Sequence, residues 1–507
     1  MEKFGVFLLS LAFHAKYLWY KFSEILGQAL ISTRFISLSI PEYVLLGFFK
    51  VNDPFRLLVV ALYLLVVAVI SLVVFPTGIT HPLLSYLVLG ERLGEGYVLY
   101  GDVIEDIGPL AAGVFAGMNW LFGRSVLAYE ILGRVLIFLQ IVYWNTVLLR
   151  YRVFQDNTYL PAIVMAALFQ LSFDLSLLTP QLLGSTFLIL ALGQLFSLTV
   201  LQKESSESTL LIGLYGGIAA GFHLSYLIFL PYLLLTGIAI SGFSFRQVML
   251  SLMGFLVPIL LMLVFFYWKD SLADAFSIFP FLFTYDKYRF LDLTTLILFL
   301  VIPGILGLLG FLFSVFFKGS SINQQKQRQL IILWLIFGFA ELLLIKRQAP
   351  YQLGIFFPGL TYLITAFFVS GGKNLAIKLC FGLLLIGLPL GGWLFWSSDQ
   401  AESSGYFVQT PSGNPPVSGQ KILVWDDQLG YYLTNQLGGP FLNSHLSKDY
   451  LEQNLSLWEK SRIYSSFANQ RPTVVIDQSG GFRNFLIQFP AIQAWYDERE
   501  PGYYFLK

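Results

Sequence analysis

A run of acidic residues lies between apolar segments near the start of the chain, and it is the first place where chemistry is expected. The stretch from His81 to Trp120 is rich in glycine and aromatic residues and contains one lysine or arginine, Arg92. Carboxylates can take a proton from a hydroxyl group or bind a cation. The carboxylates of this stretch are Glu91, Glu95, Asp102, Glu105 and Asp106. A solvated loop without chemistry is the alternative interpretation.

Two adjacent cations, Lys346 and Arg347, follow one apolar run and precede another, Gln352–Val369. Positive charges normally concentrate in cytoplasmic loops, but the order of the expected spans places this pair on the outer face. Cations placed against that trend favour an anionic partner, and a lipid phosphate at headgroup depth is the natural one. Snorkelling of both side chains to ordinary headgroups is the alternative.

The residue types disfavour several other chemistries. One cysteine, Cys380, and four histidines provide neither a disulfide framework nor a credible Ser/His/Asp or Cys/His set. The sequence has no phosphate-binding Gly-x4-Gly-Lys-Ser/Thr loop, so an ATP-driven pump is not expected. It also has no basic tract, and its net charge of +1 does not indicate a nucleic-acid partner. His81, Asp102, Asp106 and His223 could gather around a divalent cation, although a lone histidine is more often a satisfied polar residue. No metal ligand set or cofactor is otherwise indicated.

The composition points to a membrane protein. Of 507 residues, 56% are hydrophobic and 12% are charged, with a mean hydropathy of +0.70. Soluble domains carry about 25% charged residues. Because apolar runs of roughly 20 residues recur over 55–396, we predict a polytopic α-helical membrane protein with about eleven transmembrane helices. No small-residue cleavage site follows an early apolar core, so no removable signal peptide is expected.

Charge flanking the first clear span, Phe55–Pro76, sets the expected orientation. Lys50 and Arg56 flank its start, and the outer loop 77–125 is acidic, which places the N-terminus in the cytoplasm. Residues 1–54 are interpreted as an N-terminal interfacial amphipathic segment, with a partial extra span as the alternative. Gly108–Gly123 is short for a span, at about 16 residues, and is expected to lie along the outer surface.

A soluble part follows the last expected span. Residues 397–420 are rich in Ser, Gly and Pro and are predicted to be a linker. Alternating elements in 421–507 predict a small α/β extracytoplasmic domain. The expected strands are 421–425, 440–443, 473–477 and 503–506, and the expected helices are 428–437, 448–467 and 482–496. Asp426, Asp427 and Asp477 follow strand ends, where ligands often bind, but no dinucleotide-binding motif follows the first strand.

The motifs and their order along the chain make this protein resemble the GT-C superfamily of membrane glycosyltransferases, which use polyprenyl-phosphate sugars on the outer face. One motif is the acidic first loop, Gly96-Tyr97-Val98-Leu99-Tyr100-Gly101-Asp102, leading to Gly108-Pro109-Leu110. Another is Lys346-Arg347…Tyr351…Pro358, which is similar to a Lys…Tyr…Pro segment of the aminoarabinose- and mannosyl-transferase branches. The C-terminal outer domain is the third feature. The chain also resembles multi-span membrane proteins of the Bacteroidota type.

The resemblance implies transfer of a sugar from a polyprenyl-phosphate donor to an envelope lipid, glycan or protein at the bacterial inner membrane. A carboxylate would take the proton of the acceptor, and the candidates in order are Asp102, Asp106 and Glu91. Cationic and polar groups would hold the lipid phosphate, and the candidates are Lys346, Arg347 and Tyr351.

One departure from the family pattern supports a second hypothesis. The family usually has an acidic residue very soon after the first span, where this chain has Thr80-His81-Pro82-Leu83. The alternative is therefore a non-catalytic GT-C-like membrane subunit that binds a lipid carrier or a protein partner in an envelope assembly. A transporter is disfavoured because no pair of matching broken helices occurs in two halves.

Overall fold

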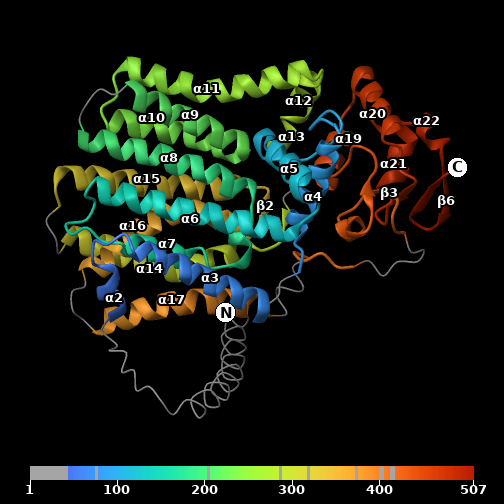
Figure 1. Ribbon diagram of the computed structural model, residues 1–507. Helices are drawn as coiled ribbons and strands as arrows, with labels where there is room; N and C mark the ends of the chain where they lie inside the picture. The colour runs from blue at the N-terminus through green and yellow to red at the C-terminus, as the bar shows by residue number, and fades with distance from the viewer. Residues whose placement is uncertain are drawn as a thin grey trace, which may run out of the picture.

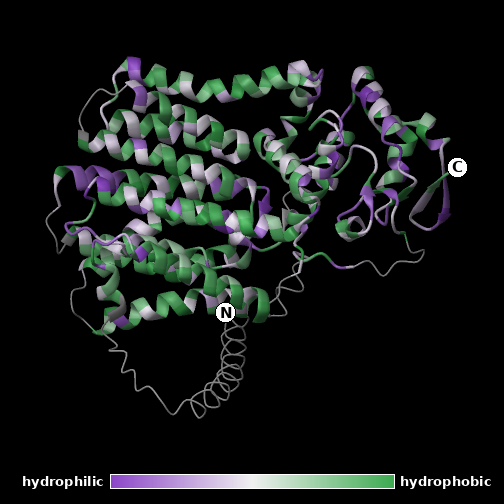
Figure 2. Cartoon of the chain, in the orientation of Figure 1, coloured by the Kyte–Doolittle hydropathy of each residue, from purple (hydrophilic) through white to green (hydrophobic). Residues whose placement is uncertain are grey.

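The computed structural model describes residues 44–74, 78–201, 206–284, 288–316, 320–370, 375–398, 405–410 and 417–507. Within those ranges, eight helical segments are long and apolar enough to cross a membrane. They run side by side in Figure 1, and apolar residues predominate along them in Figure 2. They are α3 (Arg56–Val74), α6 (Val126–Arg150), α8 (Pro180–Leu201), α11 (Phe245–Trp268), α14 (Leu293–Phe316), α15 (Ile322–Leu344), η3 (Pro350–Phe356) continued by α16 (Phe357–Ser370), and α17 (Leu375–Trp396). The expected multi-span helical class is confirmed, whereas the count of about eleven stays a prediction.

Shorter helices complete the bundle. They are α2 (Val44–Phe49), α7 (Leu160–Leu168), α9 (Ser206–Phe222) and α10 (Phe229–Ala239), which is preceded by the 3-10 turn η2 (Leu224–Ile228). His223 separates α9 from η2 with an extended backbone, so the helix is broken at this residue. Of the expected N-terminal segment 1–54, residues 1–43 lie outside the described ranges, and α2 packs Leu46 and Phe49 into the core of the bundle.

Several short elements gather at one end of the bundle, which we call the domain end because the C-terminal domain lies there (Figure 1). They are α4 (His81–Gly94), α5 (Pro109–Phe122), the 3-10 turn η1 (Phe173–Ser176), α12 (Leu272–Ile278), α13 (Phe281–Thr284) and the parallel pair β1 (Tyr288–Arg289) and β2 (Arg347–Gln348). Residues 78–125 are thus largely helical. The Thr80 hydroxyl accepts a hydrogen bond from Leu83 N (3.4 Å), and Pro82 lies in the first turn, as at many helix starts.

The start of α5 is packed directly against the broken end of α9. A methyl group on Gly108 would overlap the carbonyl oxygens of Gly221 and Phe222, whereas a methyl group on Gly113, within α5, would meet nothing within 4 Å. Gly108 therefore allows the close approach of α5 to the end of α9, and Asp106, Ile107 and His223 line the same cavity.

We predict that Gly108→Ala destabilises the protein by about 1–3 kcal/mol, because overpacking against backbone atoms forces the two helices apart. The matched Gly113→Ala change should be neutral or slightly stabilising, since alanine is the better helix former. Thermal unfolding of both purified variants measures the difference. Equal melting temperatures for the two variants would contradict the close packing at Gly108.

The C-terminal domain is a five-stranded mixed sheet with helices. Its strands are β3 (Lys421–Val424), β4 (Gln436–Leu437), β5 (Val474–Ile476), β6 (Tyr496–Glu500) and β7 (Tyr503–Leu506), in the order β4-β3-β5-β7-β6. β3 is parallel to β4 and β5, and β7 is antiparallel to β5 and β6. The helical elements are η4 (Leu429–Leu433), α19 (Ser444–Glu452), α20 (Leu457–Asn469), α21 (Gly481–Gln488) and α22 (Pro490–Gln493). The predicted small α/β domain is confirmed.

Several helices and strands of the C-terminal domain have other bounds than the sequence predicted. The expected helix 428–437 is a short 3-10 turn followed by β4, and the expected helix 448–467 is two helices. The cap of the second helix explains the division, because Ser456 forms a capping box with Glu459 at the start of α20. The first helix starts earlier than expected, where Asn443 accepts a hydrogen bond from Leu446 N. The expected strand 440–443 pairs with the membrane domain instead of the sheet.

Candidate functional site

A cavity of about 250 Å³ lies at the domain end, between the loop that precedes α5, the η2 turn, α13 and the end of α15. One part of its wall is polar and includes Asp106, Gln181, His223, Lys346 and Arg347. The other part is apolar, and two of its side chains are well exposed at the surface, Phe283 (44%) and Leu344 (53%). The lining therefore combines groups suited to a charged ligand with groups suited to hydrocarbon.

The loop between α4 and α5 decides which carboxylate faces this cavity. Two residues of the loop have left-handed backbone, Gly96 (φ 98°) and Tyr100 (φ 68°), which turn the chain sharply. Asp102 closes this turn, since its Oδ2 accepts from Val98 N at 3.0 Å. Asp102, the first candidate base, therefore does not line the cavity, whereas Asp106, four residues later, does.

Arg347 holds the two carboxylates that follow. Its Nη2 lies 2.7 Å from Asp106 Oδ1 and its Nε lies 3.2 Å from Asp106 Oδ2, while Nη2 also donates to Glu105 Oε1. Glu105 is fully buried. Burial raises the pKa of the Glu105 carboxyl, and the Arg347 guanidinium opposes that rise. The expected acidic loop and the expected cations therefore meet, although Glu105 was not among the candidates.

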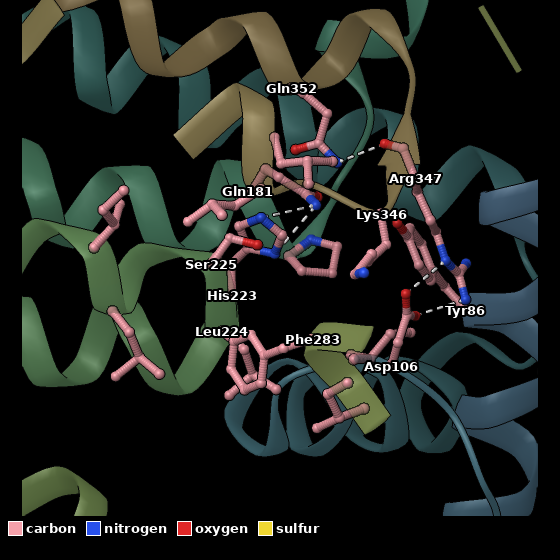
Figure 3. A pocket seen from close by; sticks show the side chains of 17 residues that line it. Tyr86, Asp106, Gln181, His223, Leu224, Ser225, Phe283, Lys346, Arg347 and Gln352 are labelled. Carbon is pink, nitrogen blue, oxygen red and sulfur yellow. Dashed lines mark hydrogen bonds and ion pairs between the residues drawn. The ribbon is translucent and has the colours of Figure 1, made fainter. Parts of the chain in front are cut away.

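Lys346 supplies the second cation. Helix α15 ends at Leu344, and the chain then forms β2, which pairs in parallel with β1 before Pro350 starts η3. In Figure 3 the Lys346 side chain reaches into the cavity between Arg347 and Asp106 on one side and His223 on the other. An ammonium group at this place is suited to bind an anion.

The wall opposite Arg347 is built at the break between α9 and η2. His223 Nε2 lies 3.2 Å from Glu341 Oε1, and Nδ1 lies 3.2 Å from Gln181 Nε2 (Figure 3). Glu341 is buried on α15, and its second carboxylate oxygen has no hydrogen-bond partner within the part of the chain that the structure describes. Sequence reasoning missed Glu341 and Gln181. A lone carboxylate in an apolar helix was the available signal, because ionisable residues within spans are seldom incidental.

The other predicted residues lie behind or beside the cavity. Glu91 forms an ion pair with Arg124, which also donates to the carbonyl of Tyr432 at 2.6 Å, so this pair ties α4 to the C-terminal domain. Tyr351 is buried, with its hydroxyl 3.5 Å from that of Tyr86. Glu91 and Tyr351 are thus brought to the domain end but do not line the cavity.

The four residues of the divalent-cation hypothesis are not all brought to the cavity. Asp106 and His223 line it, whereas the His81 ring lies 2.6 Å from the carbonyl oxygen of Asp427 and Asp102 is part of its own turn. Among the residues that the structure describes, no group of three or more histidine, cysteine, aspartate or glutamate side chains could hold a metal ion.

A buried carboxylate behind Tyr351 fixes η3. Asp174, in η1, accepts from Tyr351 N at 3.0 Å and from the Tyr406 hydroxyl at 2.8 Å, and it also accepts from Ser172. Burial raises the pKa of Asp174 to about 6, and the three hydrogen bonds oppose that rise. The native state therefore binds the Asp174 proton more tightly than the unfolded chain, whose pKa is about 3.9.

We predict that lowering the pH from 7 to 5 raises the melting temperature of the wild type relative to Asp174→Asn. The folded-state pKa is raised, so its contribution to stability is present at low pH and is lost as the pH rises through about 4 to 6. Melting temperatures of both proteins at pH 5, 6 and 7 isolate this group, because all other groups are shared. A relative loss of stability in the acidified wild type would show that the Asp174 pKa is not raised.

The C-terminal domain supports the acidic side of the cavity. Ile104 N donates to the Pro440 carbonyl at 2.7 Å, and Asn443 N donates to the Ile104 carbonyl at 3.2 Å, so the loop pairs with 440–443. Asn443 Nδ2 also donates to Glu105 Oε1 at 3.1 Å. The loop carrying Glu105 and Asp106 is therefore held between the bundle and the domain.

Comparisons with known proteins identify the fold. The structure is similar to the crystal structure of ArnT from Cupriavidus metallidurans bound to undecaprenyl phosphate, with a TM-score of 0.51 and 14% sequence identity over 86% of this chain and 95% of that one. No protein-family model and no curated protein sequence matches the chain. This likeness shows the fold, and the GT-C-like fold that the motifs predicted is confirmed.

Proposed function

We propose that this protein is a GT-C-type glycosyltransferase that moves a sugar from a polyprenyl-phosphate donor to an envelope lipid, glycan or protein. The domain end of the bundle would face the outer side of a bacterial inner membrane. The observation that carries the proposal is that Lys346, Arg347 and Asp106 share one cavity, whose lining also includes the exposed apolar side chains of Phe283 and Leu344. The similar crystal structure contains undecaprenyl phosphate, a ligand of the same two-part chemistry.

The residues of the cavity would divide the reaction between them. Asp106 would take the proton of the acceptor hydroxyl, whose oxygen then bonds to the anomeric carbon of the sugar. The bond between that carbon and the phosphate oxygen breaks, and the electron pair leaves with the lipid phosphate. Lys346 and Arg347 would stabilise the charge of the departing phosphate. Phe283 and Leu344 would contact the first isoprene units of the carrier.

Binding of the carrier is the first test. We predict that Lys346→Gln weakens the affinity for undecaprenyl phosphate by about tenfold or more, since a charge-assisted hydrogen bond contributes roughly 1.5–3 kcal/mol. Lys269→Gln is the matched control, because Lys269 is an exposed lysine at the end of α11 away from the cavity lining. Native mass spectrometry of the purified protein with undecaprenyl phosphate gives both affinities. Absence of binding by the wild type would overturn the proposal.

A non-catalytic subunit is the second candidate. Two observations favour it. Thr80-His81-Pro82-Leu83 stands where the GT-C family usually has an acidic residue, and Arg347 is already paired with two carboxylates. Such a subunit would bind the carrier without moving a sugar and would act with a protein partner. Stoichiometric co-purification of a partner, with sugar transfer indifferent to every carboxylate of the 91–106 segment, would favour this candidate.

A further inference from the structure

The donors of Arg347 are engaged where an anion would have to bind. Asp106 takes the edge formed by Nε and Nη2, which is the paired edge that suits a planar carboxylate or a phosphate. Glu105 takes a further bond from Nη2, and Ser85 Oγ accepts from Nη1 at 3.0 Å. A phosphate can reach this edge of Arg347 only if one of the carboxylates moves away from it.

The two carboxylates differ in how firmly they are held. Glu105 is fully buried, and its Oε1 also accepts from Asn443 Nδ2 and from Asp106 N at 2.9 Å. The pairing of Ile104 with the C-terminal domain fixes the backbone beside Glu105. Asp106, in contrast, lines the cavity (Figure 3), and its side chain is 13% exposed. An incoming anion would therefore displace Asp106 and leave Glu105 in place.

We propose that the phosphate of the lipid carrier displaces Asp106 from Arg347, and that this displacement frees the Asp106 carboxylate to act as the base. This inference rests on the proposed function and adds the order of its steps. The donor binds first, and only then can Asp106 accept the proton. A guanidinium stabilises the ionised form of a paired carboxylate, and a nearby anion favours the protonated form. Once the carrier is bound, Asp106 has a phosphate beside it and no longer the Arg347 guanidinium. Its carboxylate is then a better proton acceptor.

Glu105 has a separate, positioning role. It keeps Arg347 at the cavity wall after Asp106 has moved, because its own contacts run to Asn443 and to the Asp106 backbone. The guanidinium is then held on one edge by Glu105 and contacts the phosphate with the other. Lys346 contacts the same phosphate from the middle of the cavity.

The test compares affinities for undecaprenyl phosphate in nanodiscs at one pH and one salt concentration. Asp106→Asn removes the competing carboxylate, so the affinity should rise about tenfold or more. Asp102→Asn, a carboxylate of the same loop outside the cavity lining, should leave the affinity unchanged. Melting temperatures establish that both variants are folded, and Asp106→Ser serves as a second variant without the carboxylate.

An infrared difference spectrum reports the displacement directly. Adding undecaprenyl phosphate to the wild type should shift a carboxylate band that is absent from the spectrum of Asp106→Asn. If the wild type binds the carrier and folded Asp106→Asn binds it equally or more weakly, the displacement is wrong and the proposed function stands. If the wild type does not bind the carrier, the proposed function itself fails.

Discussion

Replacing Arg347 by methionine is expected to lower the stability of the protein by about 3–5 kcal/mol, because removal of one partner from a buried ion pair leaves the other uncompensated. The side chain is buried, and it neutralises both Glu105 and Asp106 at the junction of the bundle and the C-terminal domain. Thermal unfolding of the purified variant in detergent measures the loss.

A charge-matched set of variants separates this cause from lost packing. Adding Glu105→Gln and Asp106→Asn to Arg347→Met removes the uncompensated charges, so part of the lost stability should return. Lys346→Met is the neighbouring control and should cause a much smaller change, because Lys346 reaches into the cavity. A triple variant no more stable than Arg347→Met would contradict an electrostatic origin of the loss.

Asp106→Asn is expected to reduce sugar transfer by about 10²–10⁴-fold, the usual contribution of a positioned general base. The amide has nearly the same shape as the carboxylate but cannot accept the proton. The readout is the envelope component that disappears when the gene is deleted, quantified by mass spectrometry after complementation with each variant at equal protein level. The glycosylated carrier should accumulate.

Two other carboxylates of the same segment provide the controls. Asp102→Asn and Glu91→Gln should leave transfer near the wild-type level in folded protein, since Asp102 closes a turn and Glu91 pairs with Arg124. Full transfer by Asp106→Asn would remove Asp106 from catalysis. If sugar transfer were lost only in Asp102→Asn, and the stability of that variant were unchanged, Asp102 would be the base, as the sequence predicted.

The fold class could be predicted from the sequence because hydrophobic spans are a local signal. Helices such as α3 and α17 contain about twenty mostly apolar residues, and such a segment is expected to cross a membrane as a helix. The C-terminal domain was harder, since its elements are short and caps decide their ends. Ser456 divides one expected helix into two, Asn443 starts the first of them earlier than expected, and β6 begins within residues expected to be helical.

The candidate site was predicted in part, and long-range contacts explain the rest. The acidic loop and the Lys346-Arg347 pair were identified because their charges stand out between apolar spans. The choice between Asp102 and Asp106 depends on the left-handed turn at Tyr100 and on the pairing of Ile104 with Pro440 and Asn443. Residues more than 300 positions apart make that pairing, so neither periodicity nor spacing could indicate it.

The most direct measurement of the central claim is a cryo-electron microscopy structure with undecaprenyl phosphate bound. We predict phosphate density within hydrogen-bonding distance of Lys346 Nζ and Arg347, an Asp106 side chain turned away from the guanidinium, and a lipid chain that leaves past Phe283 and Leu344. Phosphate density at any place away from this cavity, with Asp106 still paired to Arg347, would contradict it.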